Sequence, residues 1–190
     1  MARPRTFDEE RAVDAAMRTF WRSGYEATST QDLCEATGLG RSSVYNAFSS
    51  KRELFGTALH RYMELRTART VDLLAGEAPI REKLRTLLWW IVDGDAEEPT
   101  GCLVVNSTVE LAPRDPEVAD ALRRDRERRF EALRSALDAA RRAGEIAPDR
   151  EPAALAHFFI AAISGMNVAA CGGADRQTLA AIAETALRSL

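Results

Sequence analysis

Apolar residues recur three and four positions apart along nearly the whole chain, which is the spacing of one face of an α-helix. Capping signals divide this pattern into segments. Ser50, with Glu53 three residues later, has the form of a capping box, and Asp115-Pro116 has the form of an N-cap followed by proline in the first turn. Gly24 closes the first segment. Together these signals predict an all-α protein of about nine helices.

The composition supports an ordinary folded protein. Of its 190 residues 46% are hydrophobic and 29% are charged, with a formal net charge of -3, so the chain is neither disordered by composition nor globally basic. Three cysteines, Cys34, Cys102 and Cys171, are widely and irregularly spaced, which favours reduced thiols over disulfides or zinc ligands. The N-terminal residues lack the continuous apolar core of a signal peptide, and we therefore expect a cytoplasmic protein.

An uncharged segment, residues 153–173, is nearly long enough to span a bilayer. It is rich in alanine and contains His157, Ser164 and Asn167, so its hydrophobicity is marginal for a membrane span. We therefore expect no membrane contact, and we interpret the segment as a helix that protein buries on several sides.

The stretch from Thr28 to Leu54 has the features of a helix-turn-helix. Leu33 and Val44 are apolar residues placed to seat two helices against each other, Cys34 is a small residue where they would cross, and Gly38 is free to turn between them.

In this stretch the sequence resembles the TetR family of bacterial repressors. The residues that carry the resemblance are Phe20, Gly24, Tyr25, Thr28, Ser29, Asp32, Leu33, Ala36, Gly38, Leu39, Val44, Tyr45, Phe48, Lys51 and Leu54. The resemblance implies a helix-turn-helix domain of three helices over residues 1–49 and a helical effector and dimerisation domain over residues 50–190. It further implies a ligand-responsive homodimer that binds double-stranded DNA at a pseudo-palindromic operator.

The resemblance also implies that the helix expected from Arg41 lies in the major groove. Candidates to reach base edges there are Arg41, Ser42, Ser43 and Asn46. Tyr45, Lys51 and Thr30 are assigned to phosphates, which position a protein without reading sequence. Arg3 and Arg5 are candidates for a minor groove or the DNA backbone, or belong to a frayed tail.

Residues that suit a cavity for a small apolar or aromatic effector are spread over the C-terminal part. The candidate walls are Met63, Trp89, Trp90, Phe130, Phe158 and Met166, and the candidate polar contacts are Cys102, Asn106, Glu110 and His157. For each of them, ordinary core packing is the alternative. A face of small residues, Ala154, Ala161, Ala162, Gly165 and Ala169, is the candidate dimer interface.

Cys102 allows a second hypothesis. It falls at an expected helix start, where the helix dipole favours a thiolate, so an oxidant or electrophile sensor on the same scaffold is an alternative to a small-molecule sensor. The neighbouring Leu103, Val104 and Val105 suggest burial, which would make the thiol inert.

Other classes of protein have less support. The chain contains no HExxH, P-loop or GxSxG motif, and its two histidines limit acid–base chemistry, so we do not expect an enzyme. No spacing of cysteine and histidine supports a metal site, and no cofactor is expected. A helical adaptor that binds protein would use the same helices but would not need Tyr45 and Lys51.

Overall fold

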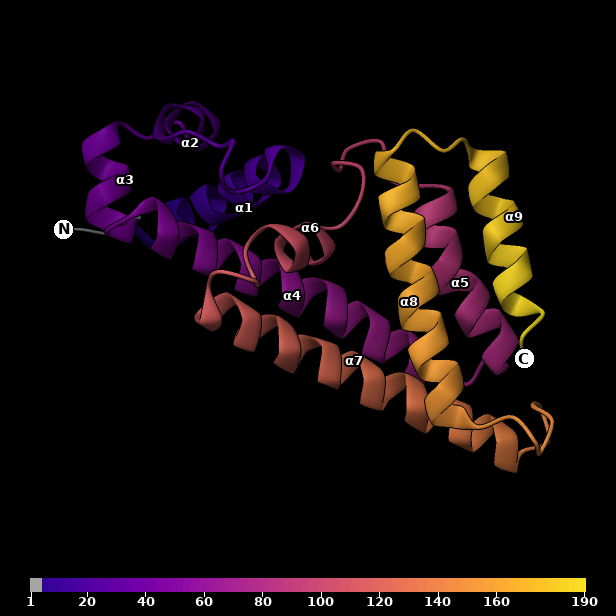
Figure 1. Cartoon of the computed structure of the whole chain (residues 1–190). Helices are drawn as coiled ribbons and strands as arrows, with labels where there is room; N and C mark the ends of the chain where they lie inside the picture. Colours follow the sequence, from indigo (N-terminus) through magenta and orange to yellow (C-terminus); the bar gives the residue numbers. More distant parts are fainter. Residues whose placement is uncertain (1–4) are drawn as a thin grey trace.

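The computed structural model describes the backbone of residues 5–190 and, except at Tyr45, the side chains from Glu9 onward. Residues 1–4, including Arg3, and the side chain of Arg5 lie outside the described residues. Within the described part the regular structure is helical throughout (Figure 1). Its helices are α1 (Arg5–Ser23), α2 (Thr30–Thr37), α3 (Arg41–Phe48), α4 (Lys51–Ala75), α5 (Ile80–Val92), α6 (Leu103–Glu110), α7 (Pro116–Arg142), α8 (Pro152–Cys171) and α9 (Arg176–Leu187). The expected all-α fold is confirmed.

The turn between α2 and α3 follows from local chemistry. The Ser29 hydroxyl accepts a hydrogen bond from the Asp32 backbone N–H, and the Asp32 carboxylate accepts one from the Ser29 N–H, which forms a capping box at the start of α2. Gly38 ends α2 with φ of 68°, a left-handed conformation that glycine adopts without strain. Leu33 and Val44 are buried where the two helices pack. The position of α3 is therefore determined by its neighbours.

The two longest helices, α4 and α7, lie side by side and join the two ends of the molecule (Figure 1). Helices α1, α2 and α3 lie at one end, α5, α8 and α9 lie at the other, and α6 lies beside α4 between the two ends. One hydrophobic core, around Phe20 and Phe55, joins α1–α4 to α6 and the first turns of α7. A second core, around Leu88 and Phe159, joins the end of α4 to α5, α7, α8 and α9. The molecule therefore has two separately packed parts.

Helix α8 is the uncharged segment of the sequence. Within the described residues it is long and apolar enough to cross a membrane by length and composition, which is weak evidence for a span. Helices α5, α7 and α9 cover one side of it, whereas Ala154, Ala161, Gly165 and Val168 are exposed. Protein therefore buries α8 on the side of these helices, whereas no helix of the described residues covers its apolar outer face.

The start of α4 is tied to the start of α7 by an ion pair. The Arg52 guanidinium donates two hydrogen bonds to the Asp115 carboxylate, at 2.7 and 3.0 Å. The same carboxylate caps α7 by accepting the N–H groups of Glu117 and Val118. The Arg52 hydrogen bonds, followed by the capping bonds, hold the pKa of Asp115 below its usual range. The ion pair thus fastens the helix that follows α3 to the C-terminal part.

We expect Asp115→Asn to lower the free energy of unfolding at about pH 7 by about 1 kcal/mol, because asparagine still caps the helix but loses the ion pair. A carboxyl whose pKa is depressed by folding stabilises the protein above the unfolded value of 3.8 and stops doing so as the pH falls through the folded value. Urea unfolding of both proteins at about pH 7 and about pH 3 checks this. If the two proteins differed equally in free energy of unfolding at both pH values, the charge of Asp115 would not have the role assigned to it.

Candidate DNA-binding surface and effector cavity

Helix α3 presents a polar face to solvent at one end of the molecule (Figure 1). The side chains assigned to base edges are all exposed on it: Arg41, Ser42, Ser43 and Asn46. On the opposite face Val44 and Phe48 are buried in the first core. An exposed polar face on a helix that is seated by its other face is the arrangement that a major-groove reading helix requires.

The phosphate candidates lie beside α3. Lys51 is the first residue of α4, and its ammonium lies 4.4 Å from the centroid of the Tyr25 ring, so a cation–π contact holds it. The Tyr25 ring is itself packed against Phe55, at 5.0 Å between centroids, and burial raises the pKa of its hydroxyl. Thr30 is the first residue of α2, and a helix N-terminus favours a nearby anion. The side chain of Tyr45 lies outside the described residues.

A cavity of about 550 Å³ lies where the two cores meet. It is lined by residues of α1, α4, α5, α6, α7 and α8 and of the α5–α6 loop, residues 93–102. All three tryptophans of the chain, Trp21, Trp89 and Trp90, line it, together with Met63 and Cys102. Its size and its aromatic wall are those of a site for one small molecule.

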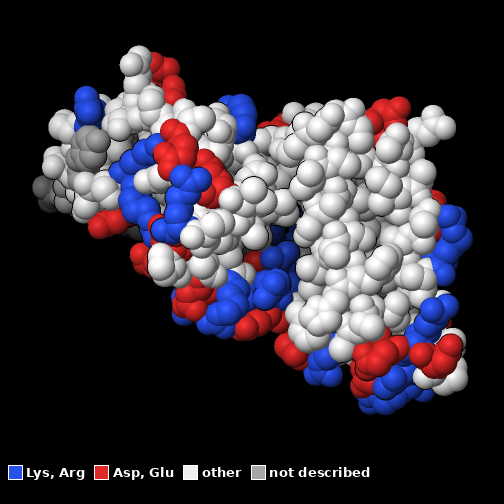
Figure 2. Space-filling view, viewed as in Figure 1, with Lys and Arg blue, Asp and Glu red and all other residues white. Residues whose placement is uncertain are grey.

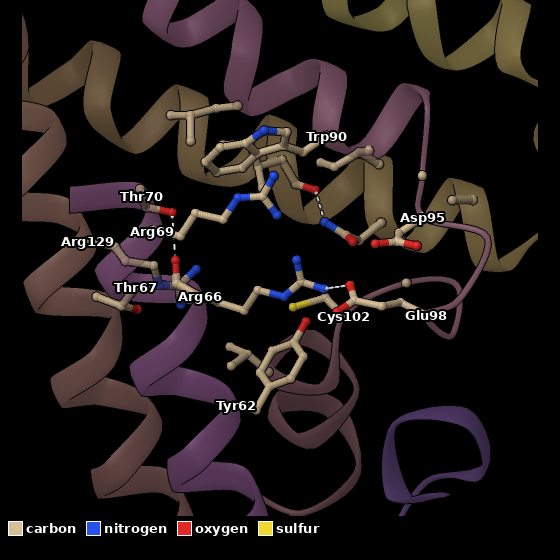
Figure 3. A pocket seen from close by; sticks show the side chains of 18 of the residues that line it. Tyr62, Arg66, Thr67, Arg69, Thr70, Trp90, Asp95, Glu98, Cys102 and Arg129 are labelled. Carbon is tan, nitrogen blue, oxygen red and sulfur yellow. Dashed lines mark hydrogen bonds and ion pairs between the residues drawn. The ribbon is translucent and has the colours of Figure 1, made fainter. Parts of the chain in front are cut away.

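Charged groups also line the cavity, and sequence reasoning missed them (Figure 3). Arg66 forms an ion pair with Glu98 of the α5–α6 loop. The Arg69 guanidinium lies 3.9 Å from the centroid of the Trp90 ring, and the Arg85 guanidinium lies 4.1 Å from the centroid of the Trp89 ring. Arginine stacks readily on an indole ring, so the wall combines flat apolar and cationic surfaces.

Sequence reasoning also missed Asp125. This residue lies in an arginine-rich stretch of α7, residues 123–129, but is only 4% exposed. The Thr67 hydroxyl donates to its carboxylate at 2.6 Å, and Arg129 forms an ion pair with it at 2.8 Å. Leu122 and Leu133, three residues before and eight after, are also buried, and this helical spacing was the signal that Asp125 faces inward.

Cys102 is the N-cap residue of α6 and is half-buried on the cavity wall. The expectation that its apolar neighbours seal it is therefore not met. Tyr62 lies beside it (Figure 3), and burial, together with the adjacent thiol, raises the pKa of the Tyr62 hydroxyl. In the described residues no three or more His, Cys, Asp or Glu side chains are grouped to hold a metal ion.

The other effector candidates lie elsewhere. Phe130 and His157 stack on each other with centroids 4.4 Å apart, and Met166 is fully buried in the second core. Phe158 is 43% exposed on the outer face of α8. The sequence shows that these residues are apolar or aromatic, but the direction in which each side chain points depends on which helices pack against its own.

Asn106 and Glu110 connect α6 to the DNA-binding end. The Glu110 carboxylate accepts the backbone N–H groups of Tyr25 and Glu26, at 3.0 and 2.8 Å. Gly24, with φ of 81°, lies so close that a Cβ there would come within 3.1 Å of this carboxylate. The Asn106 amide lies 3.5 Å from the Trp21 carbonyl oxygen. Helix α6 therefore begins at the cavity and ends on the link between α1 and α2.

Helices α8 and α9 share an apolar outer face. Figure 2 shows the surface over these helices largely free of charged side chains. Among the candidate interface residues, Ala154, Ala161 and Gly165 are exposed, and Ala162 and Ala169 are half-buried. Phe158 and Ile182 line an open groove on this face, and Val168 is 57% exposed.

This arrangement defines the class of the protein: a helix-turn-helix DNA-binding protein with a separate small-molecule cavity. Residues 12–58 match the family model described as bacterial regulatory proteins, tetR family, and residues 79–186 match that of the tetracyclin repressor-like C-terminal domain. The chain belongs to the TetR family of transcriptional regulators.

Similar proteins agree with this assignment. The HTH-type transcriptional repressor ComR of Escherichia coli (strain K12) is 34% identical over 98% of this chain and 90% of its own. The uncharacterized HTH-type regulator YezE of Bacillus subtilis (strain 168) is 32% identical over 84% of each chain. A cysteine-substituted form of the TetR family regulator CifR, solved with a 26 bp double-strand operator DNA, is 34% identical over 98% of both chains, with a TM-score of 0.86. The chain is thus a DNA-binding transcriptional regulator of a non-enzyme family.

Proposed function

We propose that the protein represses transcription as a cytoplasmic homodimer bound to a pseudo-palindromic operator, and that a small molecule in the cavity releases it. The observation that carries this proposal is the position of the cavity between the two cores, with α6 leading from Cys102 on its wall to Glu110 on the α1–α2 link. A ligand that changes the position of α6 would thereby change the position of α3. It can do so only by its difference in affinity for the two arrangements.

The division into residues 1–49 and 50–190 is part of this proposal. The first core supports such a division only in part, because Phe55 of α4 and Leu103 of α6 pack in it with Phe20. Movements of α4 and α6 would therefore be felt directly by the helix-turn-helix.

On the DNA, we assign Arg41, Ser42, Ser43 and Asn46 to base edges and Thr30, Tyr45 and Lys51 to phosphates. We expect Lys51→Ala to weaken binding to the operator and to random DNA alike, because a phosphate contact carries no sequence information. Each half-site would lose one released counterion, which lowers the slope of log K against log salt concentration by about 0.9 per half-site. Fluorescence anisotropy of labelled operator over a salt series measures both.

Arg41→Ala is the companion variant. It is expected to relax the preference at one base position of each half-site, with a loss of about 1–3 kcal/mol there. The roles are wrongly assigned if Lys51→Ala changes base preference and leaves the salt slope as it was.

We assign the dimer interface to the apolar outer face of α8 and α9, which includes Ala154, Ala161, Ala162, Gly165 and Ala169. A soluble monomer rarely exposes a continuous apolar surface of this kind. The same pairing would bury the apolar outer face of α8 in protein, so this face would not need a membrane to cover it.

A thiol switch is the second candidate, because Cys102 is reachable from the cavity. The test is the release of operator by hydrogen peroxide or a quinone from the native protein, from Cys102→Ser and, as matched controls, from Cys34→Ser and Cys171→Ser. Release that only Cys102→Ser abolishes would establish the thiol switch; equal behaviour of all four proteins supports reversible small-molecule binding.

A further inference from the structure

We infer that the effector is an aromatic monocarboxylate, whose carboxylate is bound by Arg69 and whose ring lies against the tryptophans of the cavity. The inference rests on the proposed role of the cavity as the effector site. It replaces the purely apolar or aromatic effector that the sequence suggests.

Ion pairing separates Arg69 from the other arginines of the cavity. Arg66 is paired with Glu98, Arg129 with Asp125 and Arg85 with Glu184. Arg69 has no acidic partner among the described residues, although it lines the same cavity. Arg69 is exposed in its own protomer, yet it lines the cavity, where a planar cation without a counter-ion is suited to pair with an anionic ligand.

The geometry of Arg69 suits a flat anion. Its guanidinium lies 3.9 Å from the Trp90 centroid, and Figure 3 shows it next to that ring and facing the open space of the pocket. Stacking occupies the face of the guanidinium and leaves its N–H edges free for two parallel hydrogen bonds to a carboxylate. The ligand's ring can then lie against the tryptophan side chains that line the cavity.

Other groups of the wall restrict the ligand to one carboxylate. Asp95 lies on the far side of the pocket from Arg69 (Figure 3) and is held by accepting the Glu97 N–H at 2.9 Å. A second acidic group reaching that side would meet a like charge.

In addition, the Trp21 and Arg129 side chains each have a buried N–H without an acceptor among the described residues, so hydrogen-bond donors are in surplus around the cavity.

The three tryptophans make binding measurable, because every tryptophan of the chain lines the cavity. The probes are 4-tert-butylbenzoate and 4-tert-butylbenzamide, which have the same shape and differ in charge. We expect the native protein, followed by tryptophan fluorescence, to bind the carboxylate at least about tenfold more tightly than the amide. Arg69→Met, which keeps an apolar stem against Trp90, is expected to remove this preference and leave amide binding unchanged.

Arg85→Met is the matched control, since Arg85 also stacks on a tryptophan but is paired with Glu184, at 2.9 Å. It should keep the preference for the carboxylate. Absence of binding by the carboxylate, equal binding of both probes by the native protein, or an equal loss of preference in both variants would overturn the inference.

Operator release separates this inference from the proposed function. If the carboxylate binds through Arg69 but leaves the operator bound, the ligand class of the cavity stands and the effector role fails. If neither probe binds while the protein still holds its operator, the ligand class fails and the DNA-binding role stands.

Discussion

Val168→Arg is expected to convert the dimer to a monomer and to weaken binding to a palindromic operator by more than about a hundredfold. Val168 is 57% exposed on α8, so an arginine there does not disturb the protomer. In a two-fold dimer the substitution occurs twice, and each guanidinium would be buried against an apolar face without an acidic partner. A monomer can occupy only one half-site at a time, which removes most of the specific binding energy.

Sedimentation velocity and operator titration check this prediction. Leu65→Arg is the matched control, because Leu65 is also an exposed apolar residue, 48% exposed, but lies on α4. It should remain dimeric and bind DNA normally. A dimeric Val168→Arg protein with native affinity would show that the subunits pair through another surface.

Glu110→Ala is expected to weaken the coupling between the cavity and the DNA-binding surface. The variant loses the two hydrogen bonds, at 3.0 and 2.8 Å, by which α6 holds the Tyr25 and Glu26 backbone. Tyr25 in turn supports Lys51 through the contact of 4.4 Å between ring and ammonium. Without Glu110, α6 loses its hydrogen bonds to the α1–α2 link, and only the packing of α4 and α6 in the first core still connects the cavity to α1–α3.

The coupling is measured as the ratio of two dissociation constants, with and without operator, for a compound that releases the native protein. Couplings of this kind are typically about 5- to 150-fold, and we expect Glu110→Ala to lower the ratio clearly below the native value while ligand binding alone is unchanged. The ratio for Glu110→Gln should fall between those of the native protein and Glu110→Ala, because the glutamine side chain has one acceptor oxygen where the carboxylate has two. Glu64→Ala, which removes a carboxylate paired with Arg128 on α4 and α7, is the control. A native ratio in Glu110→Ala would exclude Glu110 as the connection.

The same residues show what can be predicted from sequence. Gly38, Leu33 and Val44 act through their nearest neighbours along the chain, so the helix-turn-helix and its exposed reading face could be predicted. The capping box of Ser29 and Asp32 is equally local, although the sequence analysis did not identify it. The structure brings only some of the candidate effector residues together: Met63, Trp89, Trp90 and Cys102 line the cavity, whereas Asn106 and Glu110 contact the α1–α2 region and Phe130, His157, Phe158 and Met166 lie elsewhere.

By itself the sequence determined the helices, their ends and the exposed polar face of α3, because capping, turns and helical periodicity depend on residues at most a few positions apart. Only the tertiary structure decided the cavity and its links. Asp125 meets Thr67 across 58 residues, Glu110 meets Tyr25 across 85, and Arg69 reaches Trp90 from another helix. Such contacts depend on how whole helices pack against each other. The pattern of charged residues along one helix is the same whether a neighbouring helix or water covers that face, so the pattern alone does not reveal the contact.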